Sequence, residues 1–185
     1  FPLAAAHQHV INVSSQIYET LLNIDPKTLK VTPSIASSFT VNETGDVYTF
    51  KIQKGIFFHD DSCFGGKGRE LTPEDVKYSL DFACSGNELN DDNNVLVDQI
   101  KGASEYKASS KKSFPKGGVS GIKIKGQSVE ITLNRPFIGF EALLARKNIV
   151  IFAKEAYEKY GKEITHHPIG TGPFKLEKMD QNGLR

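Results

Sequence analysis

Apolar residues recur at three- and four-residue steps in several stretches of the chain, and this spacing predicts amphipathic helices. Residues 10–22 carry the first such stretch, with polar positions left outward. A second helix is predicted over residues 72–84, because Thr72 can cap it and Pro73 suits its first position. The same pattern predicts further helices over residues 95–106, 137–145 and 154–160, the last of them ended by Gly161.

Strict alternation of apolar and polar residues marks two β-hairpins. The first joins residues 38–41 to 47–52 through a turn at residues 42–46, and the second joins 122–125 to 129–133 through Gly126-Gln127. Single strands are also predicted over residues 149–152 and 174–179. Strand pairs interleaved with helices, without regular βαβ spacing, indicate an α+β fold with mixed, mostly antiparallel sheets and flanking helices.

Composition narrows the class of protein. The chain has 185 residues, 38% of them hydrophobic and 24% charged, and a formal net charge of +1, which argues against a nucleic-acid binder. It contains no apolar run of the roughly 18–20 residues that span a bilayer. The first residue is Phe1 and no leader-like segment precedes it, so we expect that any targeting signal has been removed. The sequence leaves open whether Cys63 and Cys84 form a disulfide or remain thiols.

Candidate chemistry along the chain is weak. The glycine-rich stretch at residues 65–68 lacks the hydroxyl residue and the strand-to-helix setting of a phosphate loop. His59, Asp60 and Asp61 are consecutive and therefore poorly placed to share a metal ion, and no nucleophile, base and orienting acid assemble. We therefore expect no catalytic residues, no metal site and no cofactor, and a binding module is favoured over an enzyme.

Residues 168–174, Pro-Ile-Gly-Thr-Gly-Pro-Phe, form the most informative motif. Two glycines around a threonine predict a tight backbone that bulkier residues would strain. A dinucleotide-binding loop is excluded, because Pro173 and the strand predicted after it stand where a helix should begin.

The order of the motifs resembles that of the family 5 extracellular solute-binding proteins, the oligopeptide- and dipeptide-binding components of ABC importers. The resemblance covers nearly the whole chain, and its motifs lie at residues 17–22, 31–36, 48–52, 55–60, 71–79, 129–133 and 168–174. Each motif is weak alone, and their collinearity is what makes the resemblance specific.

The resemblance implies that this chain is the N-terminal part of a longer, two-lobed protein with a type II periplasmic-binding-protein-like fold. Residues 1–35 would start the main ligand-binding lobe, residues 36–167 would form the α+β domain that the family inserts, and residues 168–185 would return to the main lobe. Few ligand-facing residues can be transferred. The family's loop near the bound peptide falls on Ala6, His7 and Gln8, without the acidic residue that some peptide binders place there.

The implied function is capture of oligopeptide- or dipeptide-like solutes by closure of two lobes, followed by delivery to the permease subunits of an ABC transporter. Such a protein would be periplasmic or cell-surface and lipid-anchored through an N-terminal cysteine that this chain lacks. Related proteins bind a nickel chelate, haem or a sugar instead, and these ligands stay open. Two other classes also stay open: a hydrolase using His59 with Asp60 or Asp61, and a partner-docking module using the lysine-rich residues 107–116.

Overall fold

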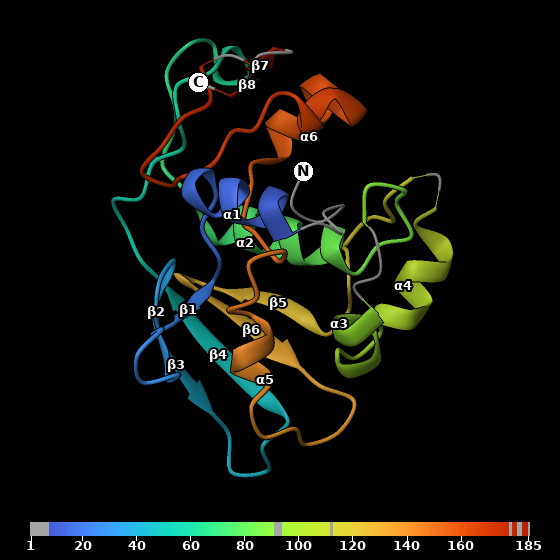
Figure 1. The fold of residues 1–185 in the computed structure, drawn as a ribbon. Coiled ribbons are helices and arrows are strands. Elements are labelled where there is room, and N and C mark those ends of the chain that lie inside the picture. The colour runs from blue at the N-terminus through green and yellow to red at the C-terminus, as the bar shows by residue number, and fades with distance from the viewer. Residues whose placement is uncertain (1–7, 91–93, 112, 178, 181–182, 185) are drawn as a thin grey trace.

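A computed structural model describes residues 8–90, 94–111, 113–177, 179–180 and 183–184 (Figure 1). The helices are α1 (Gln8–Ile17), α2 (Pro73–Ala83), α3 (Asn94–Gln99), α4 (Ala103–Ser109), α5 (Phe140–Leu143) and α6 (Lys154–Tyr160), with 3-10 turns η2 (Ser62–Phe64) and η3 (Gly161–Thr165). The strands are β1 (Leu22–Ile24), β2 (Val31–Pro33), β3 (Ala36–Val41), β4 (Val47–Ile52), β5 (Ile122–Lys125), β6 (Ser128–Thr132), β7 (Met179–Asp180) and β8 (Gly183–Leu184).

A four-stranded antiparallel sheet in the order β3-β4-β6-β5 lies at the base of the fold. Both predicted hairpins are therefore confirmed, and the pairing of β4 with β6 joins them. Tyr48, Phe50 and Ile52 alternate along β4 with more exposed residues and point into the core. Helix α2 packs on β5 and β6, as Figure 1 shows in green above the sheet. The α+β class with antiparallel sheets and flanking helices is confirmed.

Helix α2 begins and ends where local chemistry predicts. Thr72 occupies the N-cap, and its backbone N–H donates a 2.8 Å hydrogen bond to the carboxylate of Asp75. Pro73 fills the first helical position, where a missing N–H costs nothing. Cys84 forms the C-cap. Helix α6 also matches its predicted bounds and ends at Gly161.

The helix predicted over residues 10–22 is too long, because its second half pairs with distant segments. The structure ends α1 at Ile17. Thr20 then forms a β-bridge with Val150, and Ile151 N–H donates a 3.0 Å hydrogen bond to the Glu19 carbonyl. This bridge is all that forms of the strand predicted over residues 149–152. Tertiary pairing overrides helical periodicity here.

Three further predictions of local structure are wrong. The helix predicted over residues 95–106 is two helices, α3 and α4, separated by Gly102 in the left-handed conformation (φ 75°). Helix α4 ends at Ser109. Helix α5 is shorter than predicted and begins after Gly139, which also has positive φ. Residues 174–177 form no strand, and β7 begins only at Met179.

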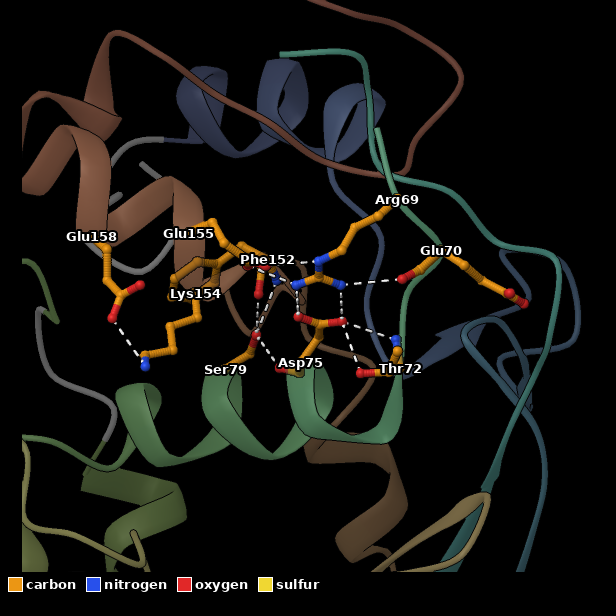
Figure 2. A network of polar contacts seen from close by, with 9 residues as sticks. All are labelled: Arg69, Glu70, Thr72, Asp75, Ser79, Phe152, Lys154, Glu155 and Glu158. Atoms are coloured by element: carbon orange, nitrogen blue, oxygen red, sulfur yellow. Dashed lines mark hydrogen bonds and ion pairs between the residues drawn. The ribbon is translucent and has the colours of Figure 1, made fainter. Parts of the chain in front are cut away.

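A polar network around Arg69 ties α2 to α6 (Figure 2). The guanidinium donates two 2.7 Å hydrogen bonds to Asp75 on α2, and bonds of 2.8 and 2.6 Å to Glu155 on α6. It also lies 5.3 Å from the ring centre of Phe58. Nearby, Phe152 N–H donates to the Ser79 hydroxyl (2.9 Å), so two segments far apart in sequence are held at a fixed spacing.

Cys63 and Cys84 are both free thiols, which answers the question that the sequence left open. Cys63 lies in η2 and Cys84 is fully buried at the end of α2. Across the described residues, none of the helices combines the length and the apolar character needed to cross a membrane.

Candidate functional site

The predicted glycine motif lies directly against the end of α1. We call residues 170–174 the GTG segment. Its backbone runs beside that helix end, since Gly172 N–H donates to the Ile17 carbonyl (2.8 Å) and Phe174 N–H donates to the Gln16 carbonyl (3.1 Å). These two bonds satisfy carbonyls that the last turn of a helix otherwise leaves without an intrahelical partner.

Both glycines of the GTG segment lie too close to the backbone of α1 to accommodate a side chain. A Cβ atom on Gly170 would lie 2.0 Å from the Ile17 carbonyl oxygen, and one on Gly172 would lie 2.5 Å from the Gln16 carbonyl oxygen. Neither approach is sterically possible without a backbone shift. The sequence predicted glycines that serve backbone geometry, and the structure identifies the geometry as a close approach to α1.

His59 holds the GTG segment from the opposite side. Its backbone N–H donates to the Gly170 carbonyl (2.9 Å), and its ring Nε2 lies 2.7 Å from the Gly172 carbonyl oxygen. Because a carbonyl oxygen only accepts, Nε2 must carry the proton. The other ring nitrogen, Nδ1, is buried without a hydrogen-bond partner in the part of the chain that the structure describes. His59 therefore positions the backbone of the GTG segment.

Two side chains complete the attachment. The Tyr18 hydroxyl is buried and accepts a hydrogen bond from Ile169 N–H (3.2 Å), and burial raises the pKa of Tyr18 well above its usual value. The Thr171 hydroxyl donates to the Glu19 carboxylate (2.8 Å). Hydrogen bonds thus join residues 16–19, at the end of α1, to residues 169–174.

A polar hollow of about 310 Å³ opens beside this contact. It is lined mostly by side chains that donate or accept hydrogen bonds: Ser15, Gln16, Tyr18, Glu19, Thr20, Asn23, Ser34, Lys147 and Pro173. Sequence reasoning missed it, because its lining comes from four separate segments. The one available signal was the spacing of the polar residues at the end of α1.

Of the three predicted ligand-facing residues, the structure describes only Gln8, at the other end of α1. Gln8 is the first residue of that helix, while Ala6 and His7 lie outside the described residues. Gln8 lies nine residues before Ile17, so more than two helical turns separate it from the contacts between α1 and the GTG segment.

The side chains of the residues considered for catalysis or metal binding, His59, Asp60 and Asp61, contact different partners. The carboxylate of Asp60 accepts from Gly68 N–H (2.8 Å), and that of Asp61 accepts from Cys63 N–H (2.7 Å) and the Tyr160 hydroxyl (2.8 Å). His59 points to the GTG segment instead. Within the described ranges, no three side chains of His, Cys, Asp or Glu lie close enough together to hold a metal ion.

Comparison with known proteins agrees with this architecture. The family model described as bacterial extracellular solute-binding proteins, family 5 Middle, matches residues 30–184. The glutathione-binding protein GsiB of Shigella dysenteriae is 33% identical over 169 residues, which is 91% of this chain and 28% of that protein. GsiB of Escherichia coli O157:H7 is similar to the same extent. The chain therefore spans little more than a quarter of the length of these relatives.

Solved structures show the same fold at lower identity. A periplasmic oligopeptide-binding protein of Borrelia burgdorferi superposes with a TM-score of 0.78 at 24% identity, covering 97% of this chain and 34% of that one. OppA of Listeria monocytogenes, bound to peptide, gives 0.77 at 23% identity, with 96% and 33% covered. With more than half of its residues matched by the family model, the chain belongs to the family 5 bacterial extracellular solute-binding proteins.

Proposed function

We propose that this chain is the N-terminal part of the solute-binding component of an ABC importer, and that the whole protein captures a short peptide or a peptide-like solute. The family match over residues 30–184 carries this proposal. The curated relatives named above are glutathione-binding proteins, and glutathione is a tripeptide. Binding would be coupled to closure of two lobes, and the loaded protein would deliver its solute to membrane permease subunits without chemical change.

Residues 1–35 would begin the main lobe, residues 36–167 would form an inserted domain, and residues 168–185 would return to the main lobe. The hydrogen bonds between the GTG segment and α1 support this division, because they join the first and third of these ranges. Ala6, His7 and Gln8 would face the solute. Export to the periplasm or cell surface, with a lipid anchor on a cysteine outside this chain, completes the proposal.

The ligand class is tested by mass spectrometry of small molecules that co-purify with the full-length protein. Glutathione or a mixture of short peptides is the expected result. A single metal chelate, haem or a sugar would overturn the peptide assignment. Calorimetry with glutathione then provides a direct affinity.

The position of the site is tested by Gln8→Ala in the full-length protein. We expect the affinity for the recovered peptide to fall about fivefold, because one hydrogen-bonding side chain at a ligand contributes roughly 1 kcal/mol. Gln53→Ala removes the same side chain from an exposed position after β4 and serves as the matched control. Equal affinity in both variants would remove Gln8 from the proposed contact.

A further inference from the structure

A cavity of about 620 Å³ lies between α2 and α6. Residues 114–118 border it on a third side, and Ile124 of β5 contributes to its lining. This volume falls within the range of 300–1,000 Å³ that is usual for small-molecule sites. The solute-binding function proposed above makes no use of it.

The two helices line the cavity in the same way. Helix α2 contributes Glu74, Lys77, Tyr78 and Asp81, whose spacing places them on one helical face, and α6 contributes Lys154, Tyr157 and Glu158. Each helix thus presents one tyrosine beside one Lys–acid ion pair. The pairs are Lys77–Asp81 at 2.8 Å and Lys154–Glu158 at 2.9 Å, the second of which is drawn in Figure 2.

Aromatic rings form the wall between these pairs. Phe82 packs edge-on against Tyr157, with ring centres 4.9 Å apart, and Phe114 lies 5.4 Å from Phe82 and 6.3 Å from Tyr78. The Tyr157 hydroxyl accepts a hydrogen bond from Asn87 (2.7 Å). The Tyr78 hydroxyl, in contrast, has no hydrogen-bond partner among the residues that the structure describes.

The charges of the lining leave one carboxylate in excess. Three acids, Glu74, Asp81 and Glu158, face two lysines, and both lysines are engaged in the ion pairs. Asp81 is further satisfied by Val119 N–H at 2.9 Å. Glu74 is exposed at the rim and forms no ion pair within the described ranges. A ligand that complements this site therefore brings an aromatic ring and a positive charge.

The cavity is built before any ligand arrives. The Arg69 network fixes α2 against α6, as Figure 2 shows. Residues 114–118 also pack tightly against α2, because a Cβ atom on Gly118 would lie 1.9 Å from the Asp81 carboxylate. Preorganisation of this kind reduces the ordering cost of binding.

We propose that the cavity between α2 and α6 is a second binding site, specific for a small aromatic amine and separate from the solute-binding cleft. The ring would pack among Tyr78, Phe114 and Tyr157, and the ammonium group would lie beside Glu74. The unpartnered Tyr78 hydroxyl would accept a hydrogen bond from the ammonium.

The test is calorimetry of the full-length protein with three probes. These are 2-phenylethylamine, 3-phenylpropionate, which keeps the ring and reverses the charge, and 2-cyclohexylethylamine, which keeps the charge and removes the aromatic ring. We expect saturable binding of 2-phenylethylamine with a Kd of about 1 mM or below, as suits a ligand of this size. Both other probes should bind at least about fivefold more weakly. Absence of saturable binding, or equal affinity for the three probes, overturns the proposal.

Variants locate the bound amine. Glu74→Gln should weaken 2-phenylethylamine binding about fivefold, whereas Glu43→Gln, the same change at an exposed turn, should leave it unaltered. Tyr78→Leu should abolish binding, with circular dichroism confirming the fold. An unchanged affinity in Glu74→Gln overturns the proposal even if Tyr78→Leu fails to fold. Saturating glutathione, or whichever solute the protein retains, should not displace the amine, and displacement would contradict a separate site.

Discussion

Arg69 and Asp75 form a bidentate ion pair in which both hydrogen bonds measure 2.7 Å, and Asp75 is almost completely buried while Arg69 is one-third exposed. Asp75 also accepts the N-cap hydrogen bond of α2 from Thr72. The same guanidinium reaches Glu155 on α6. One side chain thus stabilises the start of α2 and the packing of α6, and its removal leaves a buried carboxylate without its counter-charge.

We therefore predict that Arg69→Met lowers the free energy of unfolding by roughly 3 kcal/mol, the usual cost of removing one partner of a buried pair. Urea denaturation followed by circular dichroism measures this change. The stability of Arg69→Lys should lie between that of Arg69→Met and that of the unsubstituted protein, because an ammonium keeps the charge but cannot form the two parallel hydrogen bonds. A loss below about 0.5 kcal/mol in Arg69→Met would contradict the assigned role, since that is the range of ordinary surface substitutions.

Glu155 provides the comparison within the same network. Its side chain is 39% exposed, so solvent screens its bond to Arg69. Glu155→Gln should therefore cost less than about 1 kcal/mol. A loss as large as that of Arg69→Met would mean that the exposed half of the network, rather than Asp75, stabilises the fold.

The pH dependence of stability should carry two opposite signatures. Hydrogen bonds from Arg69 hold the pKa of Glu155 below its ordinary value of 4.5. Its stabilising contribution is therefore complete above pH 4.5 and is lost as the pH falls through the lower, folded-state pKa. Burial raises the pKa of Asp81 above its ordinary value of 3.8. Ionisation of Asp81 therefore lowers the stability of the folded state, and this loss of stability grows as the pH rises from 3.8 through the folded-state pKa.

Urea denaturation at a series of pH values from 3 to 7 tests both signs. Relative to the unsubstituted protein, Glu155→Gln should lose less stability as the pH falls below 4.5, and Asp81→Asn should lose less as the pH rises above 3.8. Parallel curves for all three proteins would contradict the assigned pKa shifts.

Local signals explain which elements were predictable. Thr72 and Pro73 determine the start of α2 through contacts within one turn, and Gly161 ends α6 within its own backbone. The two hairpins follow from turn residues and alternation, which also act over short distances. The pairing of β4 with β6, by contrast, joins Phe50 to Val129, and no pattern within either strand encodes that choice of partner.

The same distinction holds for the candidate sites. Gly170 and Gly172 were conspicuous in the sequence, yet their reason lies in the carbonyl oxygens of Ile17 and Gln16, more than 150 residues away. The interruption between α3 and α4 at Gly102 was not predicted, because a glycine inside an apolar pattern is also compatible with a continuous helix. The cavity between α2 and α6 needed three separate segments to come together, and sequence spacing alone does not supply their arrangement.

Gly170→Ala should destabilise the protein more than an alanine placed at an unconfined glycine. At Gly170 the new Cβ would meet the Ile17 backbone at 2.0 Å, so α1 or the GTG segment must move. We expect a loss of about 2–3 kcal/mol, as for overpacking of a close-packed site. At Gly55 nothing lies within 4 Å of the added atom, and only the left-handed backbone (φ 78°) opposes it, which costs about 1 kcal/mol.

Urea denaturation of both glycine variants measures the difference. Equal losses would show that α1 is not held against the GTG segment in solution. If Gln8 contacts the solute as proposed, Gly170→Ala should also weaken peptide binding by the full-length protein, while Gly55→Ala should not.

The two thiols should be unreactive in the folded protein. Burial raises the pKa of Cys63 to about 12, and the neighbouring Asp61 carboxylate adds to the effect. Cys84 is completely buried, and desolvation raises its pKa well above the usual range. Since the thiolate is the reactive form, alkylation by iodoacetamide at pH 8 should proceed slowly at both positions and become fast in 8 M urea. Mass spectrometry of peptides from timed samples separates the sites, and rapid alkylation of native Cys84 would show that the end of α2 opens readily.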